Sequence, residues 1–310
     1  MDLSKLKTVS INKRKSKVNK ALFAKTLPRG ASFKDFFKSL PEILKAKELR
    51  DVVEAIALAR AKKKPVALLM GAHVIKCGLS PLVIELIKKN IVTSVSLNGA
   101  GIIHDFEIAY CASTSEDVAE ALEDGSFGMV RETADFINAA VGEGVRRGLG
   151  FGTSVGLKIA KEKLKYRNLS IACACVEKGI PLTVHVAIGT DIIHQHLSFS
   201  GSDTGEASLR DFRRLTQEVA ELGDGGVVIN IGSAVLLPEV FLKALSVARN
   251  LKKNVKNFTT VNFDMNFHYR PYQNIVTRPV LKSGRGFYIV GHHEIMLPLL
   301  VQALKERMGR

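Results

Sequence analysis

The sequence predicts a doubly wound α/β fold with a mostly parallel, Rossmann-like six-stranded sheet, and three observations support this. The apolar residues are mainly Val, Ile, Leu and Ala, with aromatic residues at only 6% and no Trp, which is typical of a sheet covered by helices on both faces. After residue 64, short apolar runs alternate with segments of helical periodicity. Strands separated by helices run parallel, because each crossover returns the chain to the same edge of the sheet.

The expected elements follow in order along the chain. The six strands are expected at residues 66–70, 92–97, 182–187, 226–231, 258–263 and 286–290. Helices are expected at 33–40, 46–61, 82–89, 208–222, 238–252 and 294–305, with Ser80 and Pro81 as the cap and first turn of the third. Residues 105–179 contain no convincing strand and predict a long helical insertion. We therefore expect a basic N-terminal arm at 1–31 and a single α/β domain at 32–310.

The net charge of +15 is concentrated in the N-terminal arm. Residues 1–29 hold nine Lys or Arg against one acid, Asp2, which gives +8. The arm has no interleaved aromatic residues, and no helix-turn-helix or RNA-binding signature follows it. A solvated arm, or one that packs on a neighbouring subunit, is therefore favoured over a nucleic-acid partner.

Cysteine usage and hydropathy indicate a soluble, cytoplasmic protein without a membrane partner. No apolar run approaches the roughly 18 to 20 residues that a membrane helix needs. The four cysteines form no CxxC pair, so they are expected as reduced thiols. Cys173 and Cys175 lie two residues apart in an apolar helical stretch, which places them on different sides of the helix and argues against a shared metal ion.

Small and polar residues follow every expected strand. Ligands of open α/β sheets bind outside the carboxyl ends of the strands, and glycine allows the backbone to approach a ligand closely. Seven of the eight histidines fall in these loops, and only His185 lies within a strand. Imidazole titrates near neutral pH and ligates metals. The sequence therefore predicts a functional site along this edge.

Four loop motifs each leave two interpretations open. The segment Asn98–Gly101 lacks the GxGxxG pattern and could be a ligand loop or a tight turn. Asp203, in the Gly-bounded loop 201–205, could hold a polar substrate, or the loop could only cap a helix. Asp191, His194 and His196 could ligate a metal, but without an HExxH motif acid–base or hydrogen-bonding roles are favoured. Arg270 and Arg278 could clamp an anion or form surface ion pairs.

Several segments carry a family resemblance. They are Ser96–Asp105 around the Asn-Gly-Ala-Gly loop, Gly179–Asp191 ending in Thr-Asp, the Gly-Gly-Val-Val strand at 225–228, and the final helix at 294–304. Over residues 64–304 the chain resembles the deoxyhypusine synthase family. The resemblance implies an NAD-binding doubly wound fold and a homo-oligomer, a dimer or tetramer, with active sites at subunit interfaces, where the basic arm could act as a strap.

The chain departs from this family at positions that matter for its reaction. The family forms an imine on a lysine directly after Gly-Gly-Val-Val, where this chain has Ile229 and Asn230. Ile103 and His104 replace an acidic pair that binds a polyamine, and His196 replaces a later aspartate. We therefore expect a divergent relative that does not carry out authentic deoxyhypusine synthesis.

These observations predict an NAD-dependent oxidoreductase or transferase that acts on a small polar substrate. The expected cofactor-binding residues are Asn98, Gly99, Ala100, Gly101, Gly232, Ser233 and Ala234. The expected catalytic residues are His104, Asp191, His194 and His196. The expected substrate-binding residues are His73, Asp105, Asp203, Arg270, His292 and His293, and no metal is expected. The alternatives are a metal-dependent hydrolase or lyase built on the His/Asp cluster, and a nonenzymatic ligand-binding protein that uses the arm to bind a partner.

Overall fold

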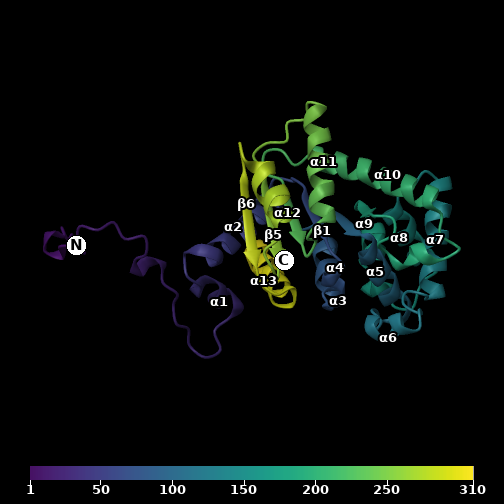
Figure 1. Ribbon diagram of the computed structural model, residues 1–310, viewed down its shortest axis with the longest axis horizontal. Coiled ribbons are helices and arrows are strands. Elements are labelled where there is room, and N and C mark those ends of the chain that lie inside the picture. Colours follow the sequence, from purple (N-terminus) through teal and green to yellow (C-terminus); the bar gives the residue numbers. More distant parts are fainter. Residues whose placement is uncertain (310) are drawn as a thin grey trace.

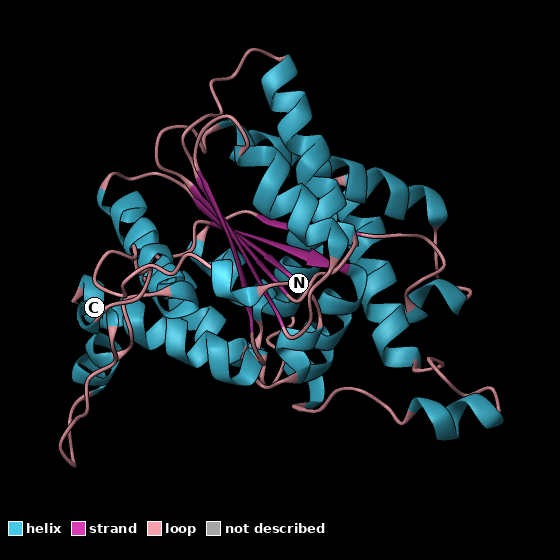
Figure 2. Cartoon of the chain, turned by 60° about the vertical axis from the view of Figure 1, so that its left-hand side comes forward, coloured by secondary structure: helices cyan, strands magenta, loops and turns pink. Residues whose placement is uncertain are grey.

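The computed structural model describes residues 1–309, and in this range six parallel strands form one sheet in the order β3-β2-β1-β4-β5-β6. The strands are β1 (Val66–Met70), β2 (Ser94–Asn98), β3 (Leu182–His185), β4 (Val227–Ile231), β5 (Thr259–Asp264) and β6 (Arg285–Val290). Figure 2 shows this sheet between layers of helices. The predicted fold class is confirmed, and each strand lies within two residues of its expected bounds.

The helices cover most of the remaining chain. They are α1 (Phe33–Ser39), α2 (Leu44–Ala61), α3 (His73–Lys76), α4 (Ser80–Lys88), α5 (Gly99–Cys111), α6 (Val118–Glu123), α7 (Arg131–Arg146), α8 (Phe151–Lys161), α9 (Ile171–Lys178), α10 (Gly201–Ala220), α11 (Leu236–Asn250), α12 (Tyr269–Pro271) and α13 (His293–Met308). Helices α5 to α9 occupy the expected insertion, and residues 105–179 contain no strand.

Two expected loops are helical in the structure. Gly201–Gly205 forms the first turn of α10, because the side chain of Ser200 accepts a hydrogen bond from the backbone N–H of Asp203 (3.2 Å) and starts the helix early. The segment expected as a polar loop before the last strand consists of α12, a π-helical stretch (Tyr272–Thr277) and a 3-10 turn (Arg278–Val280).

Helices bury both faces of the sheet. All five residues of the central strand β1 are buried, with Leu68 and Met70 in one hydrophobic cluster and Ala67 and Leu69 in the other. The first cluster includes residues of α2, α4, α9 and α13, and the second includes residues of α10 and α11. This two-sided burial is why β1 is apolar throughout instead of alternating.

A buried side chain of α10 pairs with the backbone of the edge strand β3. Asp211 of α10 accepts hydrogen bonds from the backbone N–H groups of Val184 (2.7 Å) and Gly152 (2.9 Å). Burial raises the pKa of Asp211 to about 7, although these hydrogen bonds act in the opposite direction. Without this carboxyl group, the N–H of Val184 at the outer edge of the sheet would have no hydrogen-bond partner.

The order of the strands reverses between β1 and β4. From β1 the chain adds β2 and β3 on one side and then returns to place β4, β5 and β6 on the other. The loops after β1 and β4 therefore lead to helices on opposite faces of the sheet.

The arm at 1–31 extends away from the body of the protein (Figure 1). No helix within residues 1–309 is both long and apolar enough to cross a membrane.

Candidate functional site

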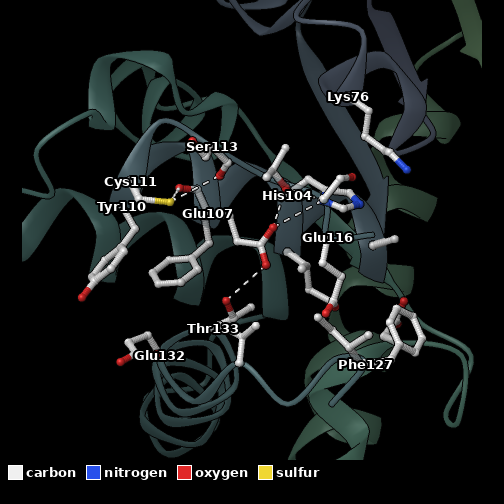
Figure 3. A pocket seen from close by; sticks show the side chains of 18 of the residues that line it. Lys76, His104, Glu107, Tyr110, Cys111, Ser113, Glu116, Phe127, Glu132 and Thr133 are labelled. Carbon is white, nitrogen blue, oxygen red and sulfur yellow. Dashed lines mark hydrogen bonds and ion pairs between the residues drawn. The ribbon is translucent and has the colours of Figure 1, made fainter. Parts of the chain in front are cut away.

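A cavity of about 570 Å³ lies at the carboxyl edge of the sheet. Residues that follow three different strands line it: Lys76 after β1, Ala100 and His104 after β2, and Asp191 after β3. Helices α5 and α7 and the segment between them complete the walls, and Figure 3 shows the labelled side chains around it. Its volume falls within the range of small-molecule sites.

Asp191 joins the two loops that the sequence singled out. Its carboxylate accepts a hydrogen bond from the backbone N–H of Ala100 at the N-terminus of α5. A Cβ atom at Gly99 would lie only 1.9 Å from Asp191 Oδ2, so only glycine fits beside this carboxylate. Asn98 caps the same helix by accepting the N–H of Gly101 (3.0 Å). The Asn-Gly-Ala-Gly turn is thus shaped to receive Asp191.

His194 lies directly behind Asp191. Its Nδ1 accepts the backbone N–H groups of Gly189 (3.0 Å) and Asp191 (3.3 Å). The neutral ring therefore carries its proton on Nε2, which lies 3.9 Å from Asp191 Oδ2. Neither of these two buried atoms has a hydrogen-bond partner. Burial raises the pKa of Asp191 to about 6 and lowers the pKa of His194, because a buried site favours the neutral form of each group.

A second polar group lines the cavity around Glu107. The carboxylate of Glu107 accepts hydrogen bonds from Thr114 and Thr133, the latter at 3.2 Å, and lies 3.5 Å from His104 Nδ1 (Figure 3). Burial alone would raise the pKa of Glu107, but the hydrogen bonds from His104, Thr114 and Thr133 outweigh it and lower the pKa. Sequence reasoning missed Glu107, although its position three residues after His104 on one helix was an available signal.

Ionisation of Asp191 gives the fold a measurable pH dependence. The folded-state pKa of about 6 exceeds the ordinary value of 3.8, so this carboxyl stabilises the fold fully below about pH 4 and loses that contribution as the pH rises through 6. The unaltered protein should therefore lose roughly 2 to 3 kcal/mol of unfolding free energy between pH 4 and pH 7.5, and Asp191→Asn should remove this loss. Urea denaturation of both proteins at several pH values measures this. An identical pH slope in the two proteins would contradict it.

His196 supports the wall of the cavity. Its Nε2 lies 2.8 Å from the carbonyl oxygen of Gly128, in the segment that leads into α7. Gly128 has a positive φ of 77°, and a Cβ there would lie 2.7 Å from the side chain of Ile192. His196 therefore fixes a tight turn next to the cavity, whose lining does not include His194 or His196.

Other predicted residues gather at the point where the strand order reverses. A Cβ at Gly71 would lie 2.1 Å from the carbonyl oxygen of Gly232, so the loops after β1 and β4 touch backbone to backbone. Ser233 Oγ accepts the N–H of Leu237 (3.2 Å) in α11. The ring of His293 is buried and lies edge-on to the exposed ring of His73, with centroids 5.7 Å apart.

The remaining predicted residues lie outside both groups. Asp105 is fully buried, and its carboxylate accepts three hydrogen bonds at the start of α9. Asp203 packs near Gly142 of α7. Arg270 pairs with Glu239 (3.4 Å), and His292 lies 3.8 Å from Glu294. The structure thus gives Asp105 a capping position in the interior, because a residue's place after a strand does not reveal which way its side chain points.

No group of three or more His, Cys, Asp or Glu side chains in residues 1–309 has a metal-binding arrangement. His194 and Asp191 are adjacent, but His194 Nδ1 already accepts two backbone hydrogen bonds. The four cysteines are free thiols, with Cys173 and Cys175 buried. The alternative of a metal-dependent hydrolase therefore gains no support from this geometry.

Comparison with known proteins supports the fold but assigns no family. Neither a protein-family model nor a curated protein sequence matches the chain. Many solved structures share its fold, and the three described next each have a TM-score of 0.53. A LOR/SDH-type protein of Methanococcus maripaludis is 16% identical over 94% of this chain and 74% of its own. AgrE, solved with ornithine and NAD+, is 15% identical over 84% of this chain. A structure from Entamoeba histolytica assigned as a deoxyhypusine synthase is 12% identical over 90% of this chain and 95% of its own.

These identities are too low to carry more than the fold. The chain spans only 33% of the AgrE chain, so most of that protein has no counterpart here. The sheet order and the edge cavity define a doubly wound α/β protein with a ligand-type site at the carboxyl ends of its strands.

Proposed function

We propose that this protein binds a nicotinamide dinucleotide at the carboxyl edge of its sheet and acts on a small polar substrate in the adjoining cavity, as an oxidoreductase or transferase. One observation carries the proposal. Asp191 lines the cavity at the N-terminus of α5, and its unpartnered oxygen faces an unpartnered ring nitrogen of His194. Buried polar atoms without partners are costly and are concentrated at functional sites.

The dinucleotide fits better where the strand order reverses than at α5. At the N-terminus of α5 the carboxylate of Asp191 already accepts the N–H of Ala100, and a phosphate there would meet a like charge. The loop after β4 offers Gly232, with a positive φ of 65°, and leads directly into the 15-residue helix α11. Backbone N–H groups at a helix N-terminus attract phosphate. The proposal therefore assigns the phosphates to Gly232, Ser233 and Ala234.

The residues of the cavity would then bind the substrate and move its proton. A bound nicotinamide ring would supply the hydride acceptor or donor. Asp191, with a pKa of about 6, is a carboxylate near neutral pH and is suited to take a proton from the substrate, which leaves it as the neutral acid; before that step the Nε2–H of His194 faces the carboxylate. Glu107, held ionised by its hydrogen bonds, would orient a polar group of the substrate. Phe106 and Phe127 line the apolar part of the cavity and exclude water.

The solved neighbours support this proposal without deciding it. AgrE was solved with both ornithine and NAD+, and the Entamoeba histolytica structure is assigned as a deoxyhypusine synthase. In the proposed function, Asn98, Gly99 and Gly101 do not bind the dinucleotide as the sequence predicted. They shape the turn that receives Asp191.

Calorimetric titration with NAD+ and NADH tests the cofactor directly. We expect Gly232→Ala to weaken binding at least tenfold, because its Cβ would lie 2.8 Å from His293 Nε2 on a backbone with positive φ. The matched control is Gly205→Ala in α10, where a Cβ meets nothing within 4 Å. Absence of binding by the unaltered protein at millimolar cofactor would refute the proposal.

A further inference from the structure

The amino edge of the sheet gathers basic loops from the whole chain. In a parallel sheet, the segments that precede the strands all lie at one edge. Here these segments are 60–64, 88–93, 177–181, 221–226, 249–257 and 281–285, and they hold thirteen Lys or Arg against three Asp or Glu. Together with the arm they account for more than the whole net charge of +15, so the rest of the chain is slightly acidic.

Hydrogen bonds join these segments into one continuous surface, which we call the amino-edge face. Each contact links neighbours in the strand order: Val95 N–H to Pro181 O (2.9 Å), Arg60 Nε to Asn90 O (2.8 Å), Lys64 Nζ to Gly223 O (2.7 Å), Asp224 N–H to Lys256 O (2.8 Å) and Asn257 N–H to Ser283 Oγ (3.3 Å). Five of the six segments contribute basic side chains, whereas 221–226 contributes none and holds Glu221 and Asp224.

Two exposed leucines lie in basic loops of this face. Leu251 is 65% exposed and Leu281 is 75% exposed, and each is followed directly by a lysine. The two loops are tied together by Arg249, whose guanidinium donates to the carbonyl oxygens of Val255 (2.9 Å) and Pro279 (2.8 Å). The two exposed leucines therefore lie on loops that Arg249 holds together, and each has a lysine as its next residue.

The expectation of no membrane partner rested on the lack of a membrane-spanning run, which says nothing of surface binding, and we propose that the amino-edge face docks on an anionic lipid bilayer. Lysines next to exposed aliphatic side chains suit this partner, since the ammonium groups meet lipid phosphates while the leucines enter the boundary with the acyl chains. A nucleic acid would pair with the charge but would leave both leucines without an apolar contact. The six segments also contain no aromatic residue on which a base could stack.

Docking in this way leaves the cavity open to solution. Helix α6, beside the cavity, lies at the opposite end of the molecule from the loop that joins α11 to β5 (Figure 1). The lipid-facing and ligand-facing ends of the sheet are therefore separate, as the direction of parallel strands requires. The proposal does not depend on the cofactor or on the substrate.

Cosedimentation of the full-length protein with vesicles tests the docking. Vesicles of 70% phosphatidylcholine and 30% phosphatidylserine are compared with pure phosphatidylcholine, at low and high salt. We expect binding to the anionic vesicles only, about tenfold weaker for Lys252→Glu/Lys253→Glu and several-fold weaker for Leu251→Ser/Leu281→Ser. Lys34→Glu/Lys38→Glu on α1 changes the net charge equally, away from this face, and should bind within about twofold of the unaltered protein.

Any of three results would overturn the proposal. One is failure of the unaltered protein to bind the anionic vesicles. A second is equal binding by the Lys252→Glu/Lys253→Glu and Lys34→Glu/Lys38→Glu proteins, which would assign the attraction to net charge or to the arm. Binding to duplex RNA or DNA that is indifferent to the two leucines, together with no leucine effect on vesicles, would identify a nucleic-acid surface instead. Thermal melts of each variant check that it is folded.

Discussion

Replacing Gly99 by alanine is expected to abolish turnover and to destabilise the fold by about 2 to 3 kcal/mol. The added Cβ would lie 1.9 Å from Oδ2 and 2.5 Å from Cγ of Asp191, so the carboxylate must leave its place at the N-terminus of α5. Its hydrogen bond from Ala100 and its position opposite His194 are then lost together. Loss of a positioned general base lowers a rate by roughly 10² to 10⁴-fold.

A double variant separates the two consequences of this change. In Gly99→Ala/Asp191→Ala the clash is gone, so urea denaturation should show most of the lost stability restored while turnover remains absent. The Gly205→Ala protein provides the matched control, since it adds the same methyl group in open space. Full activity of Gly99→Ala would show that Asp191 has no part in the chemistry.

The sheet could be predicted because its signals are local. Each strand is a short apolar run between a polar or glycine-containing turn and a helical segment, and β1 is apolar at all five positions since helices cover both of its faces. The first turn of α10 escaped prediction because its glycines at 201 and 205 suggest a loop, while the cap from Ser200 that starts the helix is a single side-chain contact.

The candidate site could be predicted only in part. Parallel topology brings Ala100, His104 and Asp191 to one cavity, as their positions after neighbouring strands predict. The position of a residue after a strand does not show how deeply its side chain is buried or which way it points. The side chain of His194 stands behind Asp191, and His196 supports a turn, so neither reaches the cavity lining. The histidines also divide into two groups, because His73 and His293 meet at the reversal of strand order.

The basic surface at the amino edge of the sheet could not be predicted from the sequence either. The excess of lysine in the arm is visible as a run, so the sequence reveals it at once. The amino-edge face is assembled from six segments that are far apart in the chain, and no window of the sequence contains it. Only the common direction of the strands makes these segments neighbours.

A second large effect is expected at Asp105, where the sequence predicted a substrate-binding residue and the structure shows a buried cap of α9. Its carboxylate accepts hydrogen bonds from Ser170 Oγ (2.6 Å) and from the backbone N–H groups of Ile171 (2.6 Å) and Ala172 (3.1 Å). Asp105→Ala would leave all three donors buried without a partner and remove the anion from the N-terminus of α9. We expect a loss of roughly 3 to 5 kcal/mol in the free energy of unfolding, measured by urea denaturation.

The conservative variant decides what the loss means. Burial raises the pKa of Asp105 to about 6, so the site already tolerates a neutral group. Asp105→Asn keeps one acceptor oxygen and should cost only about 1 to 2 kcal/mol. If the role is structural, this variant keeps the affinity for cofactor and substrate, because the side chain has no exposed surface. A folded Asp105→Asn protein that fails to bind substrate would instead return Asp105 to the site, as its position after β2 suggested.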